Sequence, residues 1–214
     1  MHLEDKPILN YVVNECLRSS KYLSGPKTGD FCSVAILTPY GDPIADRKWN
    51  CEVIQGDEHD VLSRYVTAAF QTDADYIVRV TGDCPMIIST IISKCVNVAT
   101  KNHLDFVTNA HPELRTSIDG LDVEVMSRNA LAWLHNNALT AHDREHVTKK
   151  LNEYKAAGLS YGFILNDFDL SHIKLSIDTK EEYEAMINEL DKVKKKSSIL
   201  MHKYGENSVY RFSG

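Results

Sequence analysis

The sequence predicts a single α/β domain over residues 1–214, with a mainly parallel sheet flanked by helices. Short apolar runs bounded by turn residues alternate with longer segments of helical periodicity, which is the pattern of strands joined by crossover helices. Apolar residues make up 43% of the chain, which is enough for one sizeable core. No internal repeat or low-complexity linker divides the sequence, so one domain is expected.

The N-terminal half alternates between helices and strands. A helix is expected over residues 6–23, because Pro7 suits a first turn and apolar residues then recur at helical spacing. The run CSVAIL at 32–37 is continuous and apolar, as in a strand covered on both faces. The remaining patterns predict helices at 42–49, 57–70 and 87–100 and strands at 51–55, 76–80 and 104–108.

The C-terminal half continues the alternation. Residues 119–139 predict a strand that leads into a helix, and the later patterns predict helices at 143–154 and 180–196 and strands at 159–165 and 173–177. Doubly wound sheets normally begin with a central strand that feeds a phosphate-binding loop, whereas this chain begins with a helix. The sequence therefore predicts that one strand of the usual sheet is missing.

Charge and composition exclude several classes of protein. The net charge is −6, with acids and bases mixed along the chain, which argues against a protein that mainly grips nucleic acid or an anionic membrane surface. The N-terminus lacks the apolar segment of a secretion signal, and no apolar run is long enough to cross a bilayer, so a cytoplasmic enzyme is expected. The five cysteines form no C-x-x-C pair, which predicts reduced thiols.

One acid follows a buried strand in the stretch YIVRVTGDCP at 76–85. Ligands of open α/β sheets bind beyond the carboxyl ends of the strands, and Asp83 lies just past such an end. Gly82 is expected to permit a backbone conformation closed to most residues, and Pro85 to stiffen the turn. The carboxylate suits Mg²⁺, which would need a second acid nearby. Without a metal, Asp83 would be an ordinary turn acid beside a glycine.

The best candidate for the second acid is Asp178 in KLSIDTKEEYE, which also follows an expected strand. A simpler interpretation is that Asp178 caps the next helix, because Glu181 three residues later would complete a capping box. Thr179 could serve as the cap instead. The spacing alone favours a capping residue over a metal ligand.

Two further groups of side chains could bind ligands. Asp119, Asp122 and Glu124 lie in SIDGLDVEV, where the strand period of two places Asp122 and Glu124 on one face. Taken alone, this pattern is typical of a solvent-facing side. His142 and His146 lie four apart on an expected helix, where two zinc ligands could sit. The Glu of the metalloprotease motif is absent from second place, and the sequence signals no third ligand.

Taken together, these stretches resemble one known family. The chain contains, in the order and approximate spacing of the spore coat polysaccharide biosynthesis protein F (SpsF) family, the segments GDEHDVLSRYVTAA, YIVRVTGDCPMI, SIDGLDVEVMSRNAL, DREHVT and KLSIDTKEEYE. This family is similar to the cytidylyltransferases that make CMP-activated sugar acids, such as CMP-Kdo synthetase and acylneuraminate cytidylyltransferase. The resemblance covers about Lys6 to Tyr183 and implies a Rossmann-like nucleotide-diphospho-sugar transferase fold.

The resemblance also implies a reaction: a sugar-acid oxygen attacks the α-phosphorus of CTP and pyrophosphate leaves, for surface-polysaccharide synthesis. It implies Mg²⁺ or Mn²⁺ bound by Asp83 and Asp178, CTP and a sugar acid as partners, and a homodimer. By the same resemblance, Arg144 would join Asp83 and Asp178 as a catalytic residue, and Thr38 and Gly82 would join Asp83 at the nucleotide. The sugar-acid side would be lined by Asp119, Gly120, Asp122, Glu124, Arg79 and His146.

One part of the family pattern is not found. Relatives open with a strand and a loop resembling A-R-x-x-S-x-R-L-P-G-K that cradles the triphosphate, whereas EDKPILNYVV here matches the segment after that loop. The chain is therefore expected to be an N-terminally shortened form. Two alternatives stay open: a non-catalytic dimeric homologue that cannot bind CTP, and a glycosyltransferase on the same fold. The absence of a D-x-D pair at the metal turn counts against the glycosyltransferase.

Overall fold

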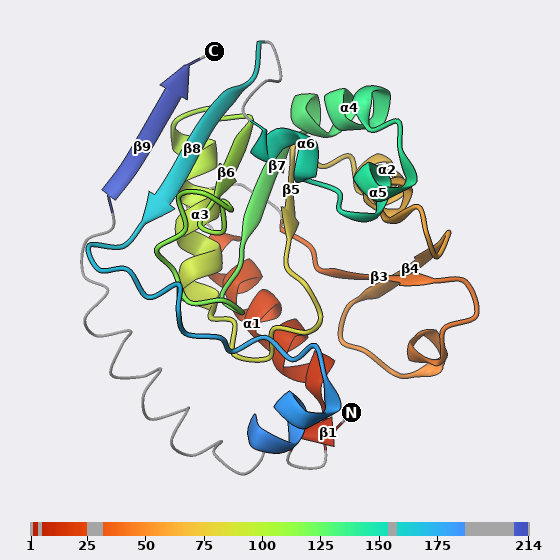
Figure 1. Cartoon of the computed structure of the whole chain (residues 1–214). Helices are drawn as coiled ribbons and strands as arrows, with labels where there is room; N and C mark the ends of the chain where they lie inside the picture. The colour runs from red at the N-terminus through yellow and green to blue at the C-terminus, as the bar shows by residue number, and fades with distance from the viewer. Residues whose placement is uncertain (1, 4–5, 25–31, 154–157, 187–207, 214) are drawn as a thin grey trace.

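The structure is a computed structural model that describes residues 2–3, 6–24, 32–153, 158–186 and 208–213 (Figure 1). Residues 180–186 form a helix, and the other helices and strands are, in chain order, β1 (His2–Leu3), β2 (Lys6–Pro7), α1 (Ile8–Leu23), β3 (Ala35–Pro39), η1 (Pro43–Asp46), β4 (Glu52–Gly56), α2 (Val61–Thr72), β5 (Tyr76–Arg79), α3 (Ser89–Lys101), β6 (Phe106–Thr108), β7 (Glu124–Ser127), α4 (Arg128–Asn137), α5 (Ala141–Glu145), α6 (Lys149–Asn152), β8 (Ser160–Leu165) and β9 (Ser208–Ser213). The α/β class predicted from the alternating patterns is confirmed.

Five strands form the main sheet in the order β5-β7-β6-β8-β9. The expectation of a mainly parallel sheet holds for β5, β6 and β8, which run in the same direction. β7 lies antiparallel between β5 and β6, and β9 lies antiparallel to β8, so the sheet is mixed. All four residues of β7 are buried, because two strands flank it and helices cover both faces.

β3 and β4 form a separate parallel pair to one side of β5 (Figure 1). Helix α2 packs on this pair, and Arg64 of α2 donates a hydrogen bond to the carbonyl oxygen of Leu37 in β3 over 3.3 Å. Within the described part of the chain, no strand pairs with the second edge of β3 or of β5. In the described residues, the β3-β4 pair is therefore not joined to the main sheet.

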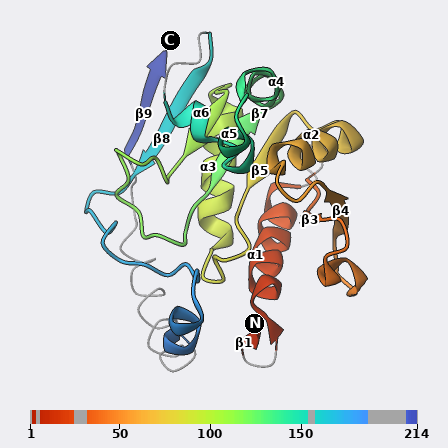
Figure 2. The ribbon, with the colours of Figure 1, turned by 45° about the vertical axis from the view of Figure 1, so that its right-hand side comes forward.

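Helices cover both faces of the main sheet. α2, α4 and α6 lie on one face, where the buried core includes Leu62, Phe106, Met126, Leu134, Leu151 and Phe163. α1 and α3 lie side by side on the other face (Figure 2), where the core includes Val12, Ile92, Cys95, Val107 and Val125. None of the described helices has both the length and the apolar character needed to span a membrane.

A few elements differ from the sequence expectations. The helix expected at 143–154 is two short helices, α5 and α6, because Val147 between them has a φ of 27°. The segment expected as a strand at 173–177 makes only one parallel bridge, between Lys174 and Asp119. Strand β9 was not predicted. Of the helix expected at 180–196, the part from 187 onward lies outside the described residues.

The five cysteines are free thiols, as predicted. Burial raises the pKa of Cys16 and of Cys95 to about 12. These two thiols therefore stay protonated at neutral pH and serve as core side chains rather than nucleophiles.

Candidate active site

The turn after β5 presents Asp83 at the end of the strand. β5 ends at Arg79, and Asp83 is half-buried between the exposed Gly82 and the buried Cys84. The prediction that Gly82 adopts a backbone conformation closed to most residues is wrong, because its φ lies outside the left-handed region. A Cβ at Gly82 would instead lie 3.3 Å from Leu9 of α1. The small size of Gly82 therefore matters for packing the turn against α1.

The main chain brings Asp178 beside this turn. The N–H of Ile177 donates a hydrogen bond to the carbonyl oxygen of Asp83 over 2.9 Å. The Asp178 side chain is 50% exposed, and its carboxylate lies 2.5 Å from the ammonium group of Lys174. Two carboxylates that are far apart in the sequence are thus carried by neighbouring backbone segments.

Thr179, rather than Asp178, caps the helix at 180–186. The N–H of Glu182 donates to Oγ1 of Thr179 over 3.2 Å, and the Glu182 carboxylate accepts from the N–H of Thr179 over 3.1 Å. This capping box lies one residue later than the expected box of Asp178 and Glu181. Helix capping therefore does not account for the Asp178 carboxylate.

Arg115 joins two of the acids in the loop before β7. Its guanidinium lies 3.1 Å from the carboxylate of Asp119 and forms a second ion pair with Asp122. The side chains of Arg115, Asp119 and Asp122 are 20%, 32% and 26% exposed. The two acids are therefore partly buried rather than fully solvent-facing. Arg115 was not among the predicted site residues, because it lies in an irregular loop where spacing along the sequence does not indicate an ion pair.

Gly120 lets this acidic loop approach the segment that carries Asp178. Its φ is 96°, and an added Cβ would lie 2.4 Å from the backbone N of Ser176 and 2.6 Å from the carbonyl carbon of Leu175. Next to it, the carbonyl oxygen of Asp119 accepts a hydrogen bond from the N–H of Leu175 over 2.7 Å. Only glycine fits both the space and the left-handed backbone. The acidic loop, the Asp178 segment and the turn after β5 therefore meet at one place.

The carboxyl group of Asp122 has an unusual environment. Burial raises its pKa to about 6, against the opposing effect of the Arg115 guanidinium and with a further increase from Asp119. Its Oδ2 accepts a hydrogen bond from Arg115, whereas its buried Oδ1 has no hydrogen-bond partner. A carboxylate oxygen that is buried without a hydrogen-bond partner disfavours the charged form of Asp122, in agreement with the raised pKa.

Arg79 and Glu124 stand opposite each other where β5 ends and β7 begins. Their charged groups lie 2.5 Å apart, and the side chains are 22% and 8% exposed. Burial disfavours the charge of Arg79, but Glu124, Tyr65 and Asp83 together outweigh this effect and raise the pKa of Arg79 above its ordinary value. The other Glu124 oxygen accepts from the Thr148 hydroxyl over 2.6 Å. Both oxygens of Glu124 thus hold β7 to its neighbours, and the role of Glu124 on the sugar side stays a prediction.

Arg144, His146 and Thr38 make their contacts elsewhere. Arg144 pairs over 2.7 Å with Asp60, the N-cap residue of α2. His146 is exposed just after α5, and the buried Thr38 donates from its hydroxyl to the carboxylate of Asp42 over 2.7 Å. The structure does bring the other predicted residues together, directly or through their sequence neighbours. The central group is Asp83, Asp119, Gly120, Asp122 and Asp178. Arg79, Gly82 and Glu124 lie beside this group.

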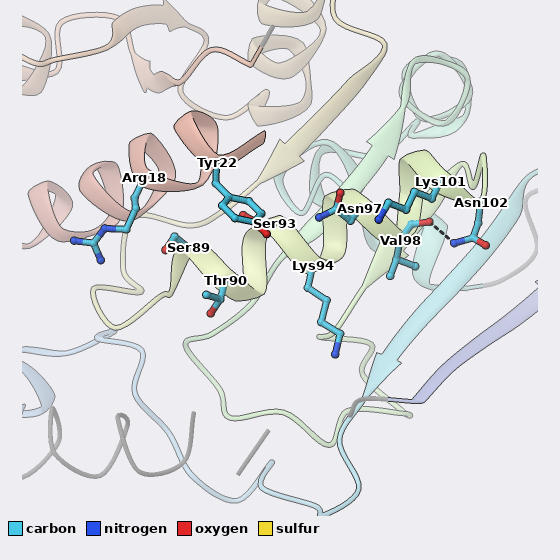
Figure 3. A pocket seen from close by; sticks show the side chains of 10 residues that line it. All are labelled: Arg18, Tyr22, Ser89, Thr90, Ser93, Lys94, Asn97, Val98, Lys101 and Asn102. Carbon is cyan, nitrogen blue, oxygen red and sulfur yellow. Dashed lines mark hydrogen bonds between the residues drawn. The ribbon is translucent and has the colours of Figure 1, made fainter. Parts of the chain in front are cut away.

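The groove shown in Figure 3 is a different place. It has a volume of about 570 Å³ and is formed by side chains of α1 and α3. Arg18, Lys94 and Lys101 line it together with polar side chains, and none of its lining residues is acidic. No predicted site residue lines this groove. The candidate active site therefore lies where the loops around Asp83, Gly120 and Asp178 adjoin, and not in this groove.

A family model described as cytidylyltransferase matches residues 1–212. The chain belongs to the cytidylyltransferase family. This cytidylyltransferase is 26% identical over 184 residues to spore coat polysaccharide biosynthesis protein SpsF of Bacillus subtilis, covering 84% of the chain and 73% of SpsF. It is 34% identical over 135 residues to an uncharacterised protein of Methanocaldococcus jannaschii, covering 62% of the chain and 53% of that protein. The match thus spans about half the length of the latter relative.

Two solved structures share the fold of this cytidylyltransferase. A cytidylyltransferase from Leptospira borgpetersenii superposes with a TM-score of 0.73 at 24% identity, covering 98% of this chain and 90% of that one. CMP:2-keto-3-deoxy-manno-octonic acid synthetase, solved in complex with CTP, superposes with a TM-score of 0.62 at 12% identity, covering 90% of each chain. These matches confirm the predicted resemblance and the Rossmann-like fold, and family membership makes the chain a nucleotidyltransferase by class.

Proposed function

We propose that this cytidylyltransferase transfers CMP from CTP to an acidic sugar that is used for a surface polysaccharide. A hydroxyl oxygen of the sugar acid attacks the α-phosphorus of CTP, the bond from that phosphorus to the bridging oxygen of the β-phosphate breaks, and pyrophosphate leaves. The hydroxyl proton passes to a base at the site or to water. The observation that carries this proposal is the contact between the Asp83 turn and the segment beside Asp178, in a chain of this family.

Asp83 and Asp178 are the residues that would hold Mg²⁺ or Mn²⁺. The donor set fits, because these ions prefer oxygen ligands and both carboxylates are at least partly exposed on adjoining backbone. The Asp178 carboxylate already pairs with a cation, the ammonium group of Lys174 at 2.5 Å. When bound, such an ion neutralises charge on the phosphate oxygens during transfer.

The acidic loop suits the sugar side of the reaction. The partly exposed carboxylate of Asp119 is an acceptor for sugar hydroxyl groups, and Asp122 lies beside it across Arg115. Arg115 balances their charge and supplies a guanidinium that can pair with the carboxylate of the substrate. The pKa of Asp122 is raised to about 6, which is in the range that suits a proton acceptor near neutral pH.

Other predicted roles supplement this core. We infer that Thr38 and Gly82 belong to the nucleotide side, and that Arg144 and His146 contact substrate only if the region around α5 takes part. We also propose a cytoplasmic homodimer, for which size-exclusion chromatography with light scattering is the measurement. A monomer at micromolar concentration would contradict the homodimer without affecting the proposed chemistry.

A direct test measures pyrophosphate release from CTP and Mg²⁺ with a panel of sugar acids that includes Kdo and nonulosonic acids. Asp83→Asn and Asp178→Asn are each expected to reduce release by about a hundredfold or more, because each removes a charge that supports phosphate stabilisation. Asp75→Asn is the matched control, because that carboxylate is 93% exposed and lies 3.9 Å from its partner Arg128. The control is expected to keep wild-type activity.

The alternatives predict different outcomes. A non-catalytic homologue would dimerise and release no pyrophosphate with any sugar acid. A glycosyltransferase would instead consume a nucleotide-sugar and leave CTP intact. Either result would overturn the proposal.

A further inference from the structure

We propose that His142, Glu145 and His146 form a binding site for a divalent transition-metal ion such as Zn²⁺. All three side chains are exposed, at α5 and the residue after it. Their ligand atoms, one from each residue, all lie within 4.8 Å of one another. The site shares no residue with the Asp83 and Asp178 pair and does not depend on the proposed function.

The local backbone gives these side chains a common face. The N–H of His146 donates to the carbonyl oxygen of His142 over 3.1 Å, so the segment is a helical turn. Residues three and four apart are neighbours on a helix surface, which brings Glu145 and His146 beside His142. The two imidazole rings are 4.3 Å apart between centroids and meet edge-on at 75°. Nitrogen atoms of both rings are therefore close enough to share one ion.

Contacts on the inner side of α5 hold this turn in place. Asp143 is buried, its N–H donates to Oγ1 of Thr140 over 3.1 Å, and its carboxylate lies 3.8 Å from Lys149. Arg144 pairs with Asp60 over 2.7 Å. These contacts fix the backbone between the exposed ligands, so little backbone freedom is lost when an ion binds.

The ligand chemistry selects the class of ion. Two imidazoles and one carboxylate suit Zn²⁺, Ni²⁺ or Cu²⁺, whereas Mg²⁺ and Ca²⁺ prefer oxygen ligands alone. Three protein ligands leave a further position of Zn²⁺ for water or another ligand. The sequence signals the two histidines without a third ligand, and the structure supplies Glu145.

Metal binding at this turn is coupled to the stability of the chain. Val147 and Thr148 follow the site directly and are buried, and the Thr148 hydroxyl donates to Glu124 over 2.6 Å. An ion that holds the turn together thus also holds Thr148 against β7. Because the ion binds only when the turn is folded, it is expected to raise the melting temperature.

The test is calorimetric titration of the full, untagged chain with ZnCl₂. One ion per chain is expected, and His142→Ala and His146→Ala should each weaken binding by about tenfold or more, because each removes a ligand. His135→Ala is the matched control, because His135 is an exposed histidine on α4 outside the cluster. It should bind Zn²⁺ with wild-type affinity, and so should Asp83→Asn.

Thermal unfolding separates loss of the site from loss of the fold. The three histidine variants should melt at the wild-type temperature without Zn²⁺, because the substituted histidines are exposed. Added Zn²⁺ should raise the melting temperature of the wild type and of His135→Ala, but not of His142→Ala or His146→Ala. Unchanged Zn²⁺ affinity in His142→Ala and His146→Ala, or an equal loss in His135→Ala, would overturn the proposal.

Discussion

The N–H of Ile177 donates a hydrogen bond to the carbonyl oxygen of Asp83 over 2.9 Å, which holds the backbone beside Asp178 against the turn after β5. Both atoms belong to the main chain, so the contact persists when either carboxylate is replaced. Substitution of Asp83 or Asp178 by Asn therefore tests the charge of the proposed metal site and leaves its backbone frame in place.

Replacing Lys174 by Met is expected to strengthen Mn²⁺ binding about twofold or more. The Lys174 ammonium lies 2.5 Å from Asp178 and 2.6 Å from Glu182, so it competes with a metal ion for the Asp178 carboxylate. Titration of Mn²⁺ followed by electron paramagnetic resonance measures the change. Lys180→Met is the control, because Lys180 pairs with Glu184 at 3.6 Å. Weaker Mn²⁺ binding in Lys174→Met would show that the lysine supports the ion instead of competing with it.

Replacing Glu124 by Ala is expected to lower the free energy of unfolding by about 3–5 kcal/mol, because Arg79 would keep its charge in a largely buried position without a partner. Urea unfolding measures this loss. The double variant Arg79→Met/Glu124→Leu should recover most of it, since an apolar pair of similar size carries no unpaired charge. Exposed Glu113→Ala is the control and should change stability by about 0.5 kcal/mol or less. A loss in Glu124→Ala no larger than in this control would contradict a stabilising role of the Arg79–Glu124 ion pair.

Replacing Gly120 by Ala is expected to destabilise the fold more than replacing Gly158 by Ala. Both glycines have positive φ, 96° and 82°, so both substitutions carry backbone strain of about 1–3 kcal/mol. Only at Gly120 does the new Cβ also meet backbone atoms, whereas nothing lies within 4 Å at Gly158. Thermal unfolding of the two variants compares the costs. Equal losses of stability in the two variants would mean that the contact of Gly120 with the Leu175–Ser176 backbone does not stabilise the fold.

The Asp122 carboxyl group is expected to make stability fall as the pH rises through about 6. Its pKa is raised in the folded protein from an ordinary 3.8 to about 6, so the folded state binds more protons than the unfolded state between these values. Its stabilising contribution is complete below about pH 4 and is lost as the pH rises through 6, by up to about 3 kcal/mol. Urea unfolding of the wild type and Asp122→Asn at several pH values measures the slopes. Identical slopes would contradict the raised pKa.

Much of the fold could be predicted because its signals are local. The apolar runs at 76–80 and 159–165 correspond to β5 and β8, and the helical periodicity near 57–70 corresponds to α2. The break at Val147 was missed because it depends on a single positive φ, which the pattern of apolar residues does not encode. The reversal of β7 was missed for a similar reason, since period-two alternation is the same in both strand directions.

The candidate site was predictable in its residue types and less so in its partners. The position of Asp83 after a strand and of Asp178 before a helix could be read directly. The residue that caps the helix could not be predicted, because Asp178 and Thr179 are both good caps and only the Glu182 contacts decide between them. Arg115 was missed because its second partner, Asp122, depends on how the loop turns at Gly120.

Calorimetric titration of the chain with CTP in the presence and absence of Mg²⁺ tests the proposed metal-dependent nucleotide site. Saturable binding of one CTP per chain that requires the metal ion is expected. Binding should fall by about tenfold or more in Asp83→Asn, because half of the proposed metal ligands lose their charge, and should be unchanged in Asp75→Asn. No CTP binding by the wild type, or equal affinity in Asp83→Asn and the wild type, would contradict the account.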